Sequence, residues 1–251
     1  MKILITNDDS INARGIRALI DCASEFGDIT AVAPLIPQSG KSSAISIESP
    51  LRMVRTGEFN GVEMWGVNGT PVDCVKLALH LMDNDKPDLI LSGINHGSNS
   101  GNAITYSGTM GAVLEGCMNK IPSIGFSLLH HSLAADFSLS RSFISEIIAK
   151  AVENPLPIYT ALNVNIPSKI VPQGIRVCRA ARGHWSEEYE EYIDPHGKPF
   201  YMLSGRFVNE ETGATDTDEY WLTHNYISVV PVCPDMSQTQ LIQPFSEIYN
   251  Q

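Results

Sequence analysis

The chain has 251 residues, of which 43% are hydrophobic, enough to bury one substantial core, so we expect a single domain over residues 1–251. Its 17 basic and 28 acidic residues give a net charge of -11, which argues against a nucleic-acid polymer as a partner, because such binding depends on Lys and Arg displacing counterions. No segment has the unbroken apolar length needed to cross a bilayer, and the N-terminus lacks a signal-peptide layout, so we expect a cytoplasmic protein without a membrane partner.

Strand-like apolar runs alternate with stretches of helical spacing through the first two-thirds of the chain. This alternation is typical of an α/β fold, with a doubly wound, mainly parallel sheet covered by helices on both faces. The expected strands cover residues 2–6, 29–33, 88–91, 123–128 and 162–166. The expected helices run from about Ile16 to Gly27, begin at Thr70-Pro71, and cover 108–118 and 137–152. Residues 92–106 are rich in Gly and Asn and are expected to form a long loop, which in a compact fold is usually functional.

Strand and turn signals replace this alternation beyond Pro167. Residues 187–192 and 200–201 flank the turn Asp194-Pro195-His196-Gly197, which predicts a long hairpin. We expect residues 182–225 to form a projecting arm, whose aromatic residues either make a subunit contact or pack on the chain's own domain. Residues 226–232 are expected to form a last strand of the sheet.

The cysteines stand singly along the chain, without the Cys-x-x-Cys pair of a zinc or redox site. We therefore expect reduced thiols, not a disulfide framework or a zinc cluster. The five positions are Cys22, Cys74, Cys117, Cys178 and Cys233.

Two adjacent carboxylates, Asp8 and Asp9, follow the first apolar run directly. Ligands bind at this end of a strand in open α/β sheets, in the crevice beyond the carboxyl ends. Two such charges without a nearby Lys are costly to hold together unless a cation lies between them. The pair therefore predicts a divalent-metal site, although one Asp capping the following helix while the other faces solvent remains an open alternative.

Two further oxygen donors, Ser39 and Asn95, follow two other parallel strands, and such loops share one edge of the sheet. Carboxylate, hydroxyl and amide oxygens suit Mg²⁺ or Mn²⁺, whereas zinc prefers Cys and His. With only two carboxylates we expect one divalent cation, Mg or Mn, per subunit. Ser and Asn are also common loop residues for local hydrogen-bonding reasons, and it is their joint placement that favours a ligand role.

An anion site is predicted where Ser107-Gly108-Thr109 opens the helix over 108–118. The first N–H groups of a helix carry about half a positive charge, and Gly108 lets a ligand approach the backbone. A phosphoryl group fits there, although a Ser N-cap without a ligand is the commoner use of such a string. The Gly-Lys pair of a P-loop is absent, so triphosphate binding of that kind is not indicated.

These residues belong to a larger set of motifs that resembles the SurE survival-protein family of 5′-nucleotidases. The resemblance is dense to about Gly125 and thinner afterwards. The motifs are Asn7-Asp8-Asp9, Gly15-Ile16, Ala33-Pro34, Ser39-Gly40, Gly69-Thr70-Pro71-Val72-Asp73-Cys74-Val75, Ser92-Gly93-Ile94-Asn95, Gly97, Asn99, Tyr106-Ser107-Gly108-Thr109, Glu115-Gly116, Thr215-Asp216-Thr217 and Ile227-Ser228-Val229.

The resemblance implies a Rossmann-like fold and a metal-dependent phosphomonoesterase that acts on nucleoside 5′-monophosphates, with 3′-nucleotides and short polyphosphate as further substrates. It also implies homodimers or homotetramers built through C-terminal arms. The metal-ligand role is carried onto Asp8, Asp9, Ser39 and Asn95. The expected substrate-binding residues are Gly40, Asn99, Ser107, Gly108 and Thr109.

Asp8 and Ser107 are the expected catalytic residues. The cation would bind a phosphate oxygen and lower the pKa of a bound water, which Asp8 would orient or deprotonate. Ser107 and Thr109, with the helix N-terminus, would hold the equatorial oxygens, while Asn95 and Asn99 would fix the surrounding loop. Arg14, Lys41 and His96 are near the expected mouth, but we interpret each as a solvated loop residue. His130-His131 is likewise interpreted as a surface feature, because adjacent strand residues point to opposite faces.

Two departures from the family pattern stand out. Ser10 occupies a position where the family usually has Gly, and Asp235-Met236-Ser237-Gln238 replaces a stretch that in many relatives contains a His. A catalytic His from that stretch is therefore not assumed.

Two rival functions remain. Paired acids after a first strand also bind Mg²⁺ in receiver-like signalling modules, but those need a third Asp ending the central strand and a late Lys. The central strand here is followed by Ser92-Gly93. A nucleotide-binding protein without turnover is the second rival, for which the acidic pair would be superfluous.

Overall fold

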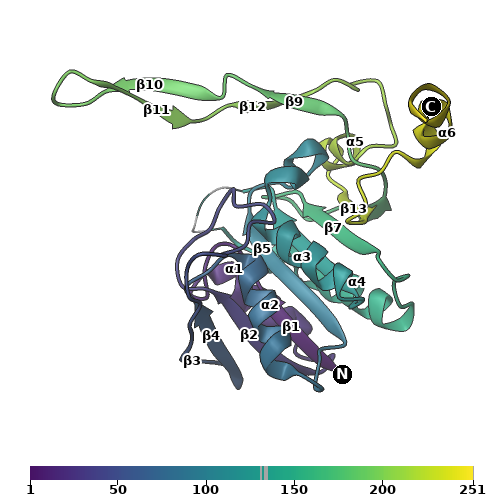
Figure 1. Ribbon diagram of the computed structural model, residues 1–251. Helices are drawn as coiled ribbons and strands as arrows, with labels where there is room; N and C mark the ends of the chain where they lie inside the picture. Colours follow the sequence, from purple (N-terminus) through teal and green to yellow (C-terminus); the bar gives the residue numbers. More distant parts are fainter. Residues whose placement is uncertain (131, 133–134, 251) are drawn as a thin grey trace.

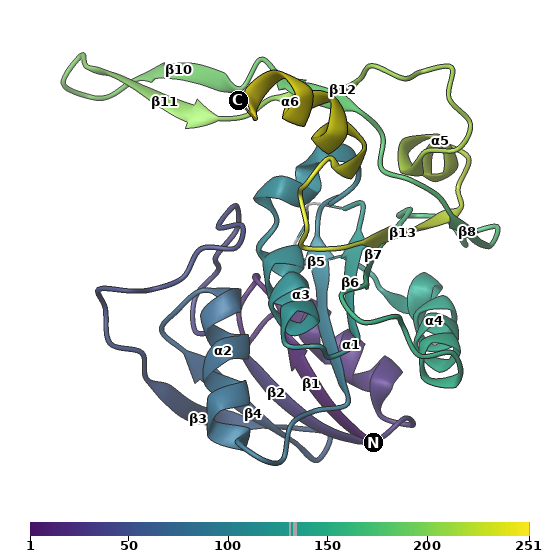
Figure 2. The same cartoon turned by 45° about the vertical axis from the view of Figure 1, so that its right-hand side comes forward.

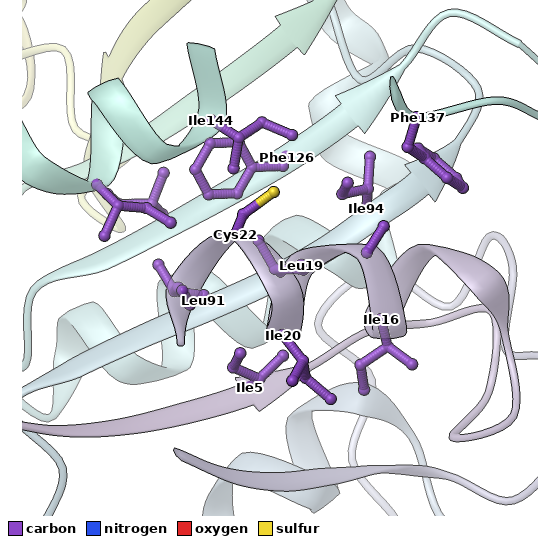
Figure 3. Close-up of a cluster of buried hydrophobic side chains, with 14 of the residues drawn as sticks. Ile5, Ile16, Leu19, Ile20, Cys22, Leu91, Ile94, Phe126, Phe137 and Ile144 are labelled. Carbon is purple, nitrogen blue, oxygen red and sulfur yellow. The ribbon is translucent and has the colours of Figure 1, made fainter. Parts of the chain in front are cut away.

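A computed structural model describes residues 1–130, 132 and 135–250. Its first strand is covered by helices on both faces. In β1 (Lys2–Thr6), Ile3 and Ile5 pack with helices α1 (Arg14–Ala23) and α4 (Arg141–Glu153), while Leu4 packs against α2 (Pro71–Met82) on the opposite face. Because successive side chains of a strand point to opposite faces, a wholly apolar run is buried on both sides. Figure 3 shows the larger of the two cores, with the side chains of α1 facing those of the strands.

One nine-stranded sheet lies at the centre of the described residues, in the order β3-β4-β2-β1-β5-β6-β7-β13-β8. Its middle strands are parallel, whereas β3 pairs antiparallel with β4 and β13 pairs antiparallel with β7. The sheet is therefore doubly wound and mainly parallel, as expected. Besides β1, the strands are β2 (Asp28–Pro34), β3 (Met53–Phe59), β4 (Val62–Val67), β5 (Leu89–His96), β6 (Ser123–Leu128), β7 (Ala161–Ile166), β8 (Ile175–Val177) and β13 (Ile227–Val232).

Helices cover both faces of this sheet. Helices α1 and α4 contribute to one core, and α2 with α3 (Gly108–Met118) covers the other face (Figure 2). The start of α2 shows the expected local chemistry, because the Thr70 hydroxyl accepts from the Asp73 N–H and the Asp73 carboxylate accepts from the Thr70 N–H, a capping box. No described helix combines the length and apolarity needed to cross a membrane. All five cysteines are free.

A long arm leaves the body of the molecule between β8 and β13 (Figure 1). Its base is the pair β9 (Gly183–Ser186) and β12 (Arg206–Asn209), and its tip is the antiparallel pair β10 (Tyr189–Ile193) and β11 (Pro199–Leu203). The predicted hairpin is therefore present. The chain returns through α5 (Asp218–Thr223) to β13 and ends in α6 (Ile242–Tyr249), which has no buried residue.

Several elements differ from the expectation. Residues 92–106 are not one loop, because β5 continues to His96 and a 3-10 helix spans Gly101–Tyr106. The expected helix over 137–152 divides into a 3-10 turn at Ser138–Ser140 and α4. The antiparallel pair β3 and β4 was not predicted, since its outer strand is mostly exposed and lacks a clear apolar alternation. His131 lies outside the described residues.

Candidate active site

Asp8 lies just beyond the carboxyl end of β1, with 4% of its surface exposed. The Thr109 hydroxyl donates to its Oδ1 at 2.7 Å, and the Gln38 N–H donates to its backbone oxygen at 2.7 Å. A Cβ added to Gly108 would come within 3.0 Å of Asp8 Oδ2. The carboxylate therefore lies against the N-terminus of α3, and only a residue without a side chain fits between them.

The charges of Asp8 and Asp9 are disfavoured by their surroundings. Burial raises the pKa of Asp8 to about 6; the Thr109 hydrogen bond opposes this rise, and the neighbouring Asp9 charge adds to it. Burial also raises the pKa of Asp9, against a lowering by the His96 N–H. Among the described residues neither acid is ion-paired with Lys or Arg. A bound cation would relieve both charges.

His96 holds Asp9 in place. Its backbone N–H donates to Asp9 Oδ2 at 3.1 Å, and its Nδ1 lies 3.0 Å from the same oxygen. The ring is 5% exposed and meets Phe137 edge-on, with centroids 5.6 Å apart. The interpretation of His96 as a solvated loop residue was therefore wrong. The place of His96 beside Asn95, at the end of a parallel strand, could have indicated a role in the site. A single sequence, however, does not show that its partner is the carboxylate of Asp9.

Asn95 and the turn containing Ser39 bring the other predicted oxygen donors to this edge. The Asn95 Nδ2 donates to the Gly97 oxygen at 3.0 Å, and no described hydrogen bond engages its Oδ1, which is left as the acceptor of the amide. Ser39 and Gly40 are exposed and directly follow Gln38, whose N–H binds the backbone of Asp8. Asp8, Asp9, Asn95 and the turn at Ser39 thus belong to loops that contact one another.

The start of α3 is organised for an anion. The Ser107 Oγ accepts from the Met110 N–H at 3.0 Å as the N-cap, and the first turn contains no acidic residue. Thr109 is fully buried, and both its hydroxyl and its backbone N–H interact with the Asp8 carboxylate. A contact of Thr109 with a phosphoryl oxygen stays a prediction.

Asn99, expected to bind substrate, is directed into the protein. It is buried, and its Nδ2 donates to the Ser127 Oγ of β6 at 2.7 Å. The side chain of Asn99 thus contacts β6, while Ser107, Gly108 and Thr109 lie at the start of α3, and substrate binding by Asn99 stays a prediction.

The donor set suits a hard cation. It consists of two carboxylates, an amide oxygen and a hydroxyl, and no group of three or more His, Cys, Asp or Glu suited to a metal is found among the described residues. Oxygen donors of this kind fit Mg²⁺ or Mn²⁺, which keep several waters, better than they fit zinc. The residues present therefore fit one cation that is completed by water and a substrate oxygen.

Comparison with known proteins places this arrangement among relatives. A family model described as survival protein SurE matches residues 3–187. A protein of Christiangramia forsetii is 47% identical over 97% of this chain and 95% of its own length, and one of Cytophaga hutchinsonii is 44% identical over 96% and 93%. Both are named 5′-nucleotidase SurE. The crystal structure of the SurE protein from Aquifex aeolicus has a TM-score of 0.84 at 33% identity and covers 99% of both chains.

Proposed function

The chain belongs to the survival protein SurE family, and from that premise we propose that Asp8, Asp9, Ser39 and Asn95 bind one divalent cation, Mg or Mn, at which nucleoside 5′-monophosphates are hydrolysed. Full-length relatives named 5′-nucleotidase make this chain a 5′-nucleotidase, a phosphoric monoester hydrolase. The observation that carries the metal proposal is the carboxylate pair beside the start of α3, of which Asp8 is buried and Asp9 only 12% exposed, and with which no described Lys or Arg is paired.

The bound cation would supply charge neutralisation and an acidified water. Asp8 would orient or deprotonate the attacking water, and the Thr109 hydroxyl would keep its Oδ1 fixed. The start of α3, with the Gly108 N–H and the dipole of the helix, would hold equatorial oxygens of the phosphoryl group. Ser107, as the N-cap, would keep this turn in place, and its own O–H would donate to the phosphoryl group.

The anion site supports a wider substrate range. It is made of backbone groups that recognise a phosphoryl group and not the sugar that carries it. We therefore include 3′-nucleotides and short polyphosphate among the proposed substrates.

The receiver-like alternative is disfavoured by the neighbouring strand ends. β5 ends at Asn95-His96 and β6 ends at Leu128, so neither supplies the third Asp that a phosphoacceptor site needs. A binding protein without turnover is disfavoured because it would have no use for two adjacent carboxylates whose charges burial disfavours.

A homo-oligomer is part of the proposal. Every residue of β10 and β11 is exposed, including Tyr189 and Leu203, and α6 exposes Phe245 and Ile248. Apolar side chains gathered on a projecting arm suit a contact with a second copy, as a dimer or tetramer. We propose residues 182–225 as this oligomerisation arm. The cytoplasmic location stays a prediction.

Phosphate release from AMP and GMP tests the activity and the metal together. Wild-type protein should release phosphate with Mg²⁺ or Mn²⁺ and stop in EDTA, and Asp9→Asn should lower kcat by about 100-fold or more. Asp28→Asn, an exposed acid at the opposite end of the sheet, is the matched control and should change nothing. Steady release that is insensitive to both EDTA and Asp9→Asn would reject the site.

A further inference from the structure

The loop between β5 and the 3-10 helix is held at several points, which include the Gly97 N–H bond to the Leu128 carbonyl and the Ser100 hydroxyl bond to Glu219. At its start, His96 binds Asp9 through both its backbone N–H and its ring. At its end, the Gly101 N–H donates to Asp218 Oδ2 at 2.7 Å. Between them, Asn99 is held by the side chains of β7 and β6. The first anchor belongs to the proposed metal site, and the middle one is made by residues to which no role has been assigned.

The middle anchor uses both backbone groups of Asn99. Its N–H donates to Asn165 Oδ1 at 2.7 Å, and its carbonyl accepts from Asn163 Nδ2 at 2.8 Å. The Asn165 Nδ2 in turn donates to Asn163 Oδ1 at 3.1 Å. Two side chains of one strand thus reproduce the pairing that another strand would offer, so the loop is fixed without joining the sheet.

Asparagine is unusual at both of these positions in β7. Asn163 and Asn165 are fully buried in a central strand, where Asn is depleted, and alternate with Val164 and Ile166, which face the opposite core. A buried amide lowers stability unless it is hydrogen-bonded, so two apolar residues would fill the space at a lower free-energy cost. The bonds to the loop account for the polar identity of both residues.

We infer that Asn165, together with Asn163, is a positioning residue of the active site: it holds Asn99 and thereby keeps Asn95 and His96 over the carboxylate pair. The inference rests on the proposed metal-dependent function. Without the middle anchor, the loop would keep the bonds of Gly97 to β6 and of Ser100 to Glu219, but residues 98–99 would lose their attachment to β7. The end of β5 that carries Asn95 and His96 would then be held less firmly beside the carboxylate pair.

Asn165→Leu tests this role, because Leu branches at the same atom but has no acceptor for the Asn99 N–H. We expect hydrogen exchange of a peptide containing Asn99 to be at least about 10-fold faster. Mn²⁺ affinity, measured by calorimetry without substrate, should fall about 10- to 100-fold, and kcat should fall more than KM changes. Ser127→Ala removes only the side-chain contact of Asn99 and should produce the same changes at smaller size, which keeps the test decisive if Asn165→Leu folds poorly.

Two control variants separate positioning from stability. Ser228 lies opposite Asn165 on β13, and its buried hydroxyl has no hydrogen-bond partner in the described part of the chain, so Ser228→Ala should match wild type. Val164→Ala opens a cavity in the other core and should lower the melting temperature while leaving Mn²⁺ affinity and Asn99 exchange unchanged.

The outcomes separate the inference from its premise. If Asn165→Leu lowers only the melting temperature, as Val164→Ala does, while Mn²⁺ affinity and kcat stay at the wild-type values, the positioning role is overturned. If wild-type protein neither binds Mn²⁺ nor releases phosphate, the proposed function fails instead, and unchanged exchange at Asn99 in Asn165→Leu would then separately overturn the anchor.

Discussion

His96 contacts Asp9 twice, through its backbone N–H at 3.1 Å and through its ring Nδ1 at 3.0 Å, and both contacts go to Oδ2. This double contact fixes the carboxylate in one rotamer and leaves Oδ1 as the oxygen available to a cation. An outer partner that orients a ligand commonly contributes to metal affinity as much as to geometry.

His96→Ala keeps the backbone contact and removes the ring. We expect the Mn²⁺ concentration needed for half-maximal phosphate release to rise about 10- to 100-fold, because Asp9 gains rotational freedom. His80→Ala, at an exposed position on α2, is the control and should behave as wild type. Equal metal dependence in the two variants would remove His96 from the site.

Gly108→Ala should separate activity from stability. The added Cβ would lie 2.9 Å from Asp8 Cβ, too close for either to stay in place, although Ala suits the first turn of a helix. We expect kcat to fall about 100-fold, because displacement by a fraction of an ångström disturbs the carboxylate and the anion site together. The same assay on Gly213→Ala, where the new Cβ meets no atom within 4 Å, should give wild-type rates. Full activity in Gly108→Ala would show that this close approach is dispensable.

Ser10→Gly should stabilise the protein. Ser10 has a φ of 96°, a conformation that costs a residue with a side chain about 1–2 kcal/mol, while Gly loses about 0.5–1 kcal/mol of chain entropy on folding. The difference predicts a gain of about 0.5–1 kcal/mol, or about 1–3 °C in Tm, by calorimetry. Ser24→Gly, where φ is -60°, should instead lower Tm. A lower Tm for Ser10→Gly would mean that the hydroxyl contributes more than the backbone costs.

Replacing exposed apolar residues of the arm should alter assembly and not folding. Tyr189 and Leu203 face each other across β10 and β11 and are 67% and 73% exposed. If they are buried against a second copy, Tyr189→Ser with Leu203→Ser should weaken association by about 2 kcal/mol or more, which light scattering over a dilution series will detect. His196→Ser, at an exposed position in the turn of the same arm, is the control. An unchanged mass at every concentration would place the contact elsewhere.

The hydrophobic pattern of the sequence was sufficient to predict the strands that are buried on both faces of the sheet. The runs that form β1, β2, β5 and β6 are mainly apolar and mostly buried, so their strands could be predicted, and with them the edge of the sheet that carries Asp8 and Asn95. Thr70 and Asp73 likewise predicted the start of α2, because they form a local capping box.

The contacts that cross the fold could not be predicted in this way. The pairing of His96 with Asp9 and of Asn165 with Asn99 joins residues far apart in the sequence, and no local pattern distinguishes a buried Asn or His from a loop residue. The roles expected for Thr109 and Asn99 were also tied to their motifs, whereas the structure directs both side chains into the protein. The metal ligands themselves stay a prediction.

The arm begins and ends at nearly one point. The Ala181 N–H donates to Asp218 Oδ1, and the Asp218 N–H donates to the Arg179 carbonyl, so the excursion starts beside the residue at which it finishes. An insertion whose two ends lie this close together can be shortened, or replaced by the arm of a relative, while the strands of the sheet keep their pairing. Quaternary structure can thus diverge within such proteins independently of their chemistry.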